Sequence, residues 1–109
     1  MHKLLPVALK LRWKGPGDNY EATVETTVPD SCYKAKSIKK GLEGMMGIPE
    51  IQYVTADLSH EGAICADVIG KVKQTVSGLR SGGHPMGVVA VVRLKGKVIG
   101  TASKRFPRR

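Results

Sequence analysis

The feature that most constrains this chain is a pair of apolar segments within residues 88–102, joined at Lys95-Gly96. Both are rich in β-branched side chains, which suit a pleated strand better than a helix. Gly96 supplies the positive φ that tight hairpin turns need, which predicts a β-hairpin with a two-residue turn; a three-residue turn is the alternative. The predicted pairs are Arg93–Val98, Val92–Ile99, Val91–Gly100 and Ala90–Thr101. Both faces are apolar away from the turn, so we expect at least one strand to be covered on both sides.

Two earlier segments alternate apolar and polar side chains, the pattern of a half-buried strand. They cover residues 7–13 and 20–28, and a cluster of Gly, Pro, Asp and Asn separates them. Pairing Lys14 with Glu21 brings opposite charges together on one face and apolar side chains together on the other. The acidic face of the second strand therefore has a structural explanation and needs no catalytic role.

The remaining segments predict further short strands. Residues 51–58 alternate, and residues 63–75 are expected to form one long or broken strand with Gly70 as a bulge. Residues 32–46 fit either a short strand at 32–37 followed by a loop, or an amphipathic helix that two internal glycines disfavour. Six to seven strands predict an all-β fold, a small antiparallel β-sandwich. The alternative is an α+β fold with one helix at 32–46.

Length and composition predict a single β-rich domain at 1–103 and a basic tail at 104–109. Aromatic residues make up only 5% of the chain, so the core must be aliphatic. No run of about 18 apolar residues occurs, so we expect no transmembrane segment. Two cations interrupt the apolar N-terminal stretch and no cleavage site follows, which argues against a signal peptide. We expect a cytoplasmic protein if this is the full-length chain, and an exported one if its cysteines are bridged.

The two cysteines are 33 positions apart, a spacing that fits neither Cys-x-x-Cys nor a zinc motif. From the residues alone two states are open: a bridge between Cys32 and Cys65, or two buried thiols. A copper site built from His84, methionines and a cysteine is conceivable, but the methionines are explained more simply as core or loop filler. We predict no catalytic residue, no metal site and no cofactor.

Two motifs carry a resemblance to a protein family. One strand ends in Thr-x-x-Pro-x-x-Cys at Cys32, and after another strand comes Gly62-Ala63-Ile64-Cys65-Ala66-Asp67-Val68. Over roughly residues 20–103 this pattern resembles small bacterial β-sandwich proteins that have no assigned activity. The resemblance implies that Cys32 and Cys65 pair and that a hairpin closes the domain.

Charge is unevenly distributed along the sequence. Residues 1–67 hold eight Lys/Arg and nine Asp/Glu, whereas residues 68–109 hold ten Lys/Arg and no acid, which accounts for the net charge of +9. Such asymmetry favours an anionic partner, although a basic surface also serves solubility alone. If the tail folds back beside the hairpin turn, the two form one basic end. The predicted polyanion-binding residues are Arg93, Lys95, Lys97, Lys104, Arg105, Phe106, Arg108 and Arg109.

These observations predict a non-enzymatic binding or interaction domain whose partner is an unknown protein or a polyanion. The first alternative is a nucleic-acid-binding module that uses the basic C-terminal half. The second alternative is a metal-carrying or catalytic domain, which requires a cluster of Cys, His, Met or carboxylate side chains that spacing alone does not reveal.

Overall fold

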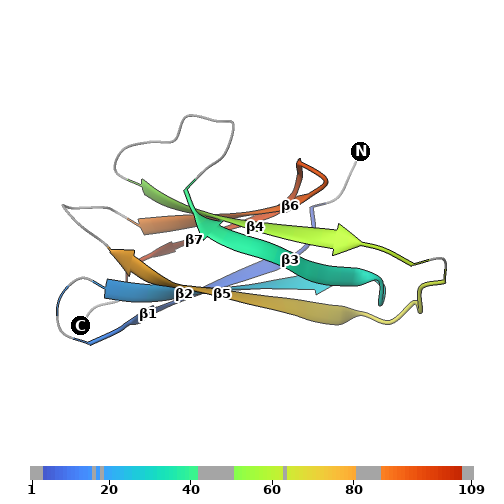
Figure 1. The fold of residues 1–109 in the computed structure, drawn as a ribbon, viewed down its shortest axis with the longest axis horizontal. Helices are drawn as coiled ribbons and strands as arrows, with labels where there is room; N and C mark the ends of the chain where they lie inside the picture. Colours follow the sequence, from blue (N-terminus) through green and yellow to red (C-terminus); the bar gives the residue numbers. More distant parts are fainter. Residues whose placement is uncertain are drawn as a thin grey trace.

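The computed structural model describes residues 4–15, 17, 19–41, 51–62, 64–80 and 87–106, which form seven strands in two packed sheets (Figure 1). The strands are β1 (Val7–Trp13), β2 (Asn19–Val28), β3 (Tyr33–Lys40), β4 (Ile51–His60), β5 (Gly70–Arg80), β6 (Gly87–Leu94) and β7 (Lys97–Arg105). One sheet has the order β1-β2-β5 and the other β3-β4-β6-β7. The predicted all-β sandwich is confirmed.

The described residues contain no helix, and so none that could cross a membrane. The alternative helix at 32–46 is wrong where it can be compared, because residues 33–40 form β3. Residues 42–46 lie outside the described part of the chain. Bulging between Ala35 and Ser37 lets this lysine-rich strand pair with β4 over its whole length.

Alternation determines which side chains enter the core. Every second residue of β2 is buried, beginning with Tyr20, and the intervening residues face solvent. β6 is covered on both faces, because Val92 is fully buried on one side and Val91 is only 7% exposed on the other. The core is aliphatic apart from Tyr20, and its buried members are Leu9, Tyr20, Ala22, Val24, Val28, Val54, Ala56, Leu58, Leu79, Val88, Ala90 and Val92.

The β1–β2 pairing has the predicted faces but a different register. Arg12, rather than Lys14, is the backbone partner of Glu21, so the true pairing is displaced by two residues. A displacement of two residues keeps every side chain on its face, because the side-chain period of a strand is two. Lys14 still reaches Glu21 with its ammonium group, at 3.3 Å.

The hairpin turn is confirmed, since Lys95 and Gly96 both adopt positive φ, at 51° and 80°. The predicted register holds for Arg93–Val98 but then shifts by one residue, so that Val92 pairs with Gly100. The shift skips Ile99 and places Gly100, where a Cβ would lie 2.6 Å from the Val7 side chain of β1, opposite Val92. The pairs predicted beyond the shift, including Val91–Gly100, are wrong.

Two connections between the sheets also depart from expectation. Residues 64–69 are not part of a strand and β5 begins at Gly70, so the long or broken strand predicted at 63–75 is confirmed for 70–75 and wrong for 64–69. The segment instead crosses from one sheet to the other between β4 and β5. Because β5 joins the sheet of β1 and β2, β6 returns to the other sheet and pairs with β4 in parallel, so the sandwich is mixed rather than wholly antiparallel.

The two lateral sides of the sandwich are closed differently. On one side β1 meets β7, and the Leu5 N–H donates to the Ile99 carbonyl at 2.7 Å. On the other side β3 lies against β5, and the Gln74 amide donates to the carbonyl oxygens of Ser37 at 2.8 Å and Asp57 at 3.1 Å. The exposed cations of β3 and β5 belong to the two strands that form this second side.

Candidate functional site

The predicted polyanion-binding residues are not gathered in one place. Lys95 and Lys97 are exposed at the β6–β7 turn, whereas Lys104 and Arg105 lie at the opposite end of β7. A strand of that length separates its ends by about 26 Å, at roughly 3.3 Å per residue. β7 continues through the first two residues of the expected tail. Arg108 and Arg109 lie outside the described residues.

Two members of that predicted set have structural roles. The guanidinium of Arg93 binds the Asp57 carboxylate with two nitrogens, at 2.8 and 3.0 Å. Arg93 lowers the pKa of the Asp57 carboxyl, chiefly through its hydrogen bonds to the carboxylate. Phe106 stacks on Trp13, with ring centroids 5.6 Å apart, and meets Tyr20 edge-on at 5.1 Å. The ring expected to contact nucleic acid bases therefore packs against the protein's own aromatic cluster.

A second group of cations belongs to β3 and β5, the strands that meet along one lateral side of the sandwich. All seven cations of these two strands are exposed, and neither strand contains an acidic residue. We call this surface the basic edge. Its residues are Lys34, Lys36, Lys39, Lys40, Lys71, Lys73 and Arg80. Sequence analysis missed it because four of these lysines lie in the half of the chain whose net charge is −1, and because the contact between β3 and β5 across the two sheets is not readable from sequence.

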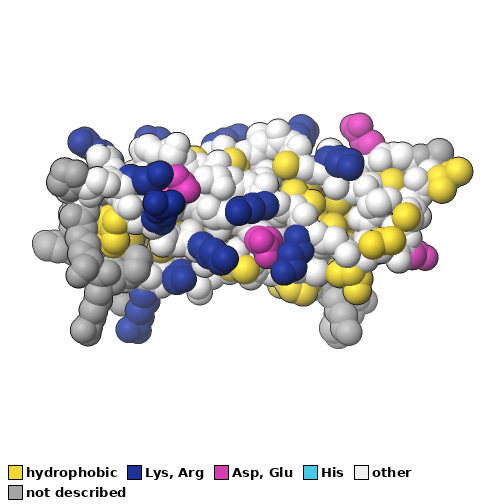
Figure 2. All heavy atoms as spheres, turned by 90° about the horizontal axis from the view of Figure 1, so that it is seen from below, with side chains coloured by type: hydrophobic (Ala, Val, Ile, Leu, Met, Phe, Trp, Pro, Cys, Tyr) yellow, Lys and Arg dark blue, Asp and Glu magenta, His cyan; other side chains and the backbone are white. Residues whose placement is uncertain are grey.

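Cations are also spread over the face of β1, β2 and β5, which Figure 2 shows from below. On this face acidic side chains of β2 offset them: Glu21 pairs with Lys14 at 3.3 Å, and Glu25 pairs with Lys71 at 3.4 Å. The opposite charges therefore neutralise one another across neighbouring strands, as the alternation of β1 and β2 predicts. Acidic residues of neighbouring strands also act on the basic edge: Glu25 pairs with Lys71, and Asp57 interacts electrostatically with Lys39.

The basic edge ends in a pocket between the two sheets. The pocket has a volume of about 590 Å³, and both Lys40 and Arg80 line it. The Tyr20 hydroxyl donates to the Gln52 amide oxygen, and the Gln52 amide nitrogen donates to the Arg80 carbonyl at 2.7 Å. Burial raises the pKa of Tyr20 to about 12, so this phenol stays protonated and uncharged at neutral pH. Tyr53 lines the same pocket.

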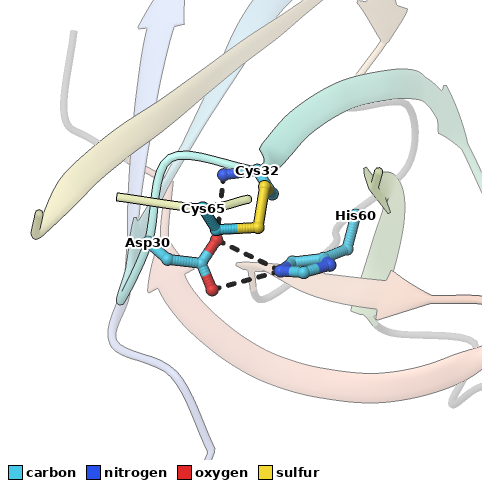
Figure 3. A group of neighbouring side chains, drawn as sticks. All are labelled: Asp30, Cys32, His60 and Cys65. Carbon is cyan, nitrogen blue, oxygen red and sulfur yellow. Dashed lines mark hydrogen bonds and ion pairs between the residues drawn. A yellow bond between two sulfur atoms is a disulfide. The ribbon is translucent and has the colours of Figure 1, made fainter. Parts of the chain in front are cut away.

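A second polar cluster occupies the opposite end of the molecule, where the chain passes twice between the sheets (Figure 3). Cys32 and Cys65 form a disulfide there, with Cα atoms 5.4 Å apart, which confirms the pairing implied by the resemblance. Asp30 accepts the Cys32 N–H at 2.9 Å, and both of its carboxylate oxygens lie 3.1 Å from the His60 Nε2 atom. That backbone hydrogen bond is the main cause of a lowered pKa at Asp30, and His60 adds to it. We call these four residues the disulfide corner.

Backbone hydrogen bonds fix the disulfide corner independently of the bridge. The Ser31 N–H donates to the Ala66 carbonyl at 3.1 Å, and the Ala66 N–H donates to the Ser31 hydroxyl at 2.9 Å. The Glu61 N–H donates to the Cys32 carbonyl at 3.2 Å. The His60 ring is oriented by an edge contact with Tyr33, at a centroid distance of 4.6 Å. Sequence analysis missed the Asp30–His60 pair, because thirty positions separate the two residues.

Hydrophobic side chains gather at this same end, on the right in Figure 2. Three of them belong to the loop between β4 and β5: Ile64 is 93% exposed, Ile69 78% and Val68 61%. The acidic residues Glu61 and Asp67 are exposed in the same loop. The long axis of the molecule thus runs from a cationic pocket to an end with apolar and acidic groups.

Comparison of the chain with protein-family models, with curated proteins and with solved structures finds no match.

Proposed function

We propose that this protein is a non-enzymatic binding domain whose partner is the phosphate backbone of a nucleic acid, and that it binds through the basic edge. The observation that carries the proposal is that two strands meeting along one side of the sandwich hold seven exposed cations and no acidic residue of their own. The proposal keeps the predicted polyanion partner but moves the binding surface from the residues predicted within 93–109 to β3 and β5.

The dimensions suit a nucleic acid strand. β3 contains eight residues and so spans about 23 Å, which corresponds to roughly seven phosphates along one strand of a duplex. The lysines of β3 are one to three residues apart, which is about 3–10 Å along the strand, so together they reach several phosphates rather than a single anion. Lys40 and Arg80 extend this row to the pocket, where two cations and a neutral phenol are suited to one further phosphate.

The chemistry favours charge rather than sequence readout. Lysine ammonium groups bind phosphate as point charges, and no aromatic side chain belongs to the basic edge as defined. Phe106, the ring that interleaves with cations in the sequence, is held by Trp13 and Tyr20. Binding should therefore be insensitive to base sequence and strongly dependent on salt.

Fluorescence anisotropy with single- and double-stranded oligonucleotides of mixed sequence, at several salt concentrations, tests the proposal. We expect the logarithm of the association constant to fall linearly with the logarithm of salt concentration. The quadruple variant of β3, with Lys34, Lys36, Lys39 and Lys40 each changed to Gln, should lower the steepness of that line by up to about 3 to 4.

A matched variant separates the basic edge from net charge. Changing Lys95, Lys97, Lys104 and Arg105 to Gln also removes four positive charges, but from the C-terminal surface predicted by sequence. We expect this variant to keep a salt slope close to that of the unmodified protein. Equal reductions of the salt slope in the two variants would show that only total charge matters. Absence of binding at low salt would refute the proposal itself.

A further inference from the structure

The four side chains of the disulfide corner present a complete set of metal-binding atoms. Asp30, Cys32, His60 and Cys65 each offer one ligand atom, and all four atoms lie within 4.8 Å of one another. They come from three separate segments: the β2–β3 turn, the end of β4 and the β4–β5 loop. Figure 3 shows the imidazole and the carboxylate turned toward each other beside the two sulfurs.

The chemistry of this donor set suits Zn²⁺. Two thiolates, one imidazole nitrogen and one carboxylate oxygen are the ligand types that zinc accepts in tetrahedral sites. With Zn–S bonds of about 2.3 Å, two thiolates on one zinc ion lie about 3.8 Å apart. The Cα separation of Cys32 and Cys65, 5.4 Å, allows that spacing through rotation of the two side chains while the backbone stays in place.

The corner is organised for a ligand without the covalent bridge. Hydrogen bonds from Ser31 and Glu61 join the crossing segments, and the Cys32 N–H holds the Asp30 carboxylate. Tyr33 fixes the plane of the His60 ring. Such outer contacts orient metal ligands and raise metal affinity. Gly62 leaves the space that Cys32 Sγ occupies, since a Cβ there would lie 2.7 Å from the sulfur.

We propose that the disulfide corner is a redox-gated zinc site. In the oxidised protein the two sulfurs are bonded to each other and cannot bind metal. A dithiol reductant supplies two electrons and two protons, which break the S–S bond, give two thiols and leave the reductant as a disulfide. One Zn²⁺ then displaces the two thiol protons and binds Cys32 Sγ, Cys65 Sγ, His60 Nε2 and Asp30. A disulfide oxidant that accepts two electrons from the thiolates restores the bridge and releases the ion.

Native mass spectrometry of the full chain with Zn²⁺, before and after reduction by a dithiol that is then removed, tests this proposal. We expect one zinc per reduced chain and none per oxidised chain. Substituting Co²⁺ for Zn²⁺ should give the strong visible absorption of a tetrahedral thiolate site. The circular dichroism spectrum of the zinc-loaded chain should match the strand-rich spectrum of the oxidised protein. The spectrum of an unfolded chain with zinc bound would overturn the proposal.

Single-residue variants distinguish a site with four ligands from two cysteine thiols that bind metal without His60 and Asp30. His60→Ala and Asp30→Asn keep both cysteines, yet each should weaken zinc binding by at least about tenfold, because even outer contacts of metal sites cost that much. Asp67→Asn, which removes a carboxylate from the same loop but outside the four ligands, should leave the affinity unchanged. The site would be contradicted if the reduced protein bound zinc no more tightly than the Cys32→Ala/Cys65→Ala variant does. It would also be contradicted if His60→Ala and Asp30→Asn bound zinc as tightly as the unmodified reduced protein. Neither outcome depends on nucleic acid binding.

Discussion

Removing the disulfide should cost this domain a large part of its stability. The bridge joins residues separated by 33 positions, and it restricts the unfolded chain over that whole loop. The chain-entropy relation gives about 3.7 kcal/mol at 25 °C for a loop of this length. That loss compares with a total of about 5–15 kcal/mol for ordinary domains, so the bridgeless protein should still fold but with a small margin.

Urea unfolding of the double variant Cys32→Ala/Cys65→Ala measures this cost. With a slope of about 1.5–2 kcal/mol/M, the midpoint should fall by about 2 M relative to the oxidised protein. EDTA must be present throughout, because zinc bound to reduced protein would raise its apparent stability. Reduced unmodified protein in EDTA is the matched comparison and should behave as the variant does. A difference below about 1 kcal/mol would show that the hydrogen bonds of Ser31 and Glu61 already confine this corner, and would refute the chain-entropy reasoning.

Three further predictions concern single side chains. Tyr20→Phe removes the donor to the Gln52 amide oxygen at a position that is 1% exposed, and should lower the free energy of unfolding by about 1–2 kcal/mol; an unchanged urea midpoint would contradict this. Gly62→Ala places a Cβ 2.7 Å from a disulfide sulfur at a φ of 140°, so it should destabilise the oxidised protein by more than about 1 kcal/mol, and equal thermal stability would count against the geometry. The hydrogen bond from Arg93 is the main cause that holds the pKa of Asp57 below its ordinary value of 3.8. The stability that this ion pair contributes is therefore present above about pH 4 and is lost as the pH falls through the lower pKa of the folded state. Asp57→Asn should therefore narrow the gap in urea midpoint between pH 7 and pH 2, and an identical pH dependence in both proteins would argue against the ion pair.

Local patterns predicted the strands well, because burial on a pleated surface repeats every two residues. The alternation in β1 and β2 assigned each side chain to its correct face, although the register was displaced by two residues. Lys95-Gly96 identified the turn, because both residues must take positive φ there. These features depend on residues that are close together in the sequence, so a local sequence pattern is enough to predict them.

Features that depend on distant segments were not predictable. The register shift between Val92 and Arg93 falls where Gly100 lies close to Val7, a residue more than ninety positions away in the sequence. The strand predicted at 63–75 does not extend over residues 64–69, where Ala66 is hydrogen-bonded to the backbone and the hydroxyl of Ser31. Alternation cannot show that a segment leaves one sheet for the other.

The distribution of cations over the surface was not predictable for a related reason. Counting charge along the chain pointed to the C-terminal half, but the sandwich places the lysines of β3 beside β5 and separates Lys97 from Arg105 by the length of β7. A local signal did exist, since four of the eight residues of β3 are lysine and none is acidic. Its interpretation was obscured because the same segment also fits a helix with lysines facing outward.

The most direct test of the account is a map of amide chemical shifts as a short oligonucleotide is added at low salt. Shifts concentrated on β3 and β5, with little change at the β6–β7 turn, are the expected result, because the basic edge is the surface proposed to contact phosphate. Shifts concentrated at residues 93–97 and 104–106 instead, or an unchanged spectrum at saturating oligonucleotide, would contradict the assignment of binding to the basic edge.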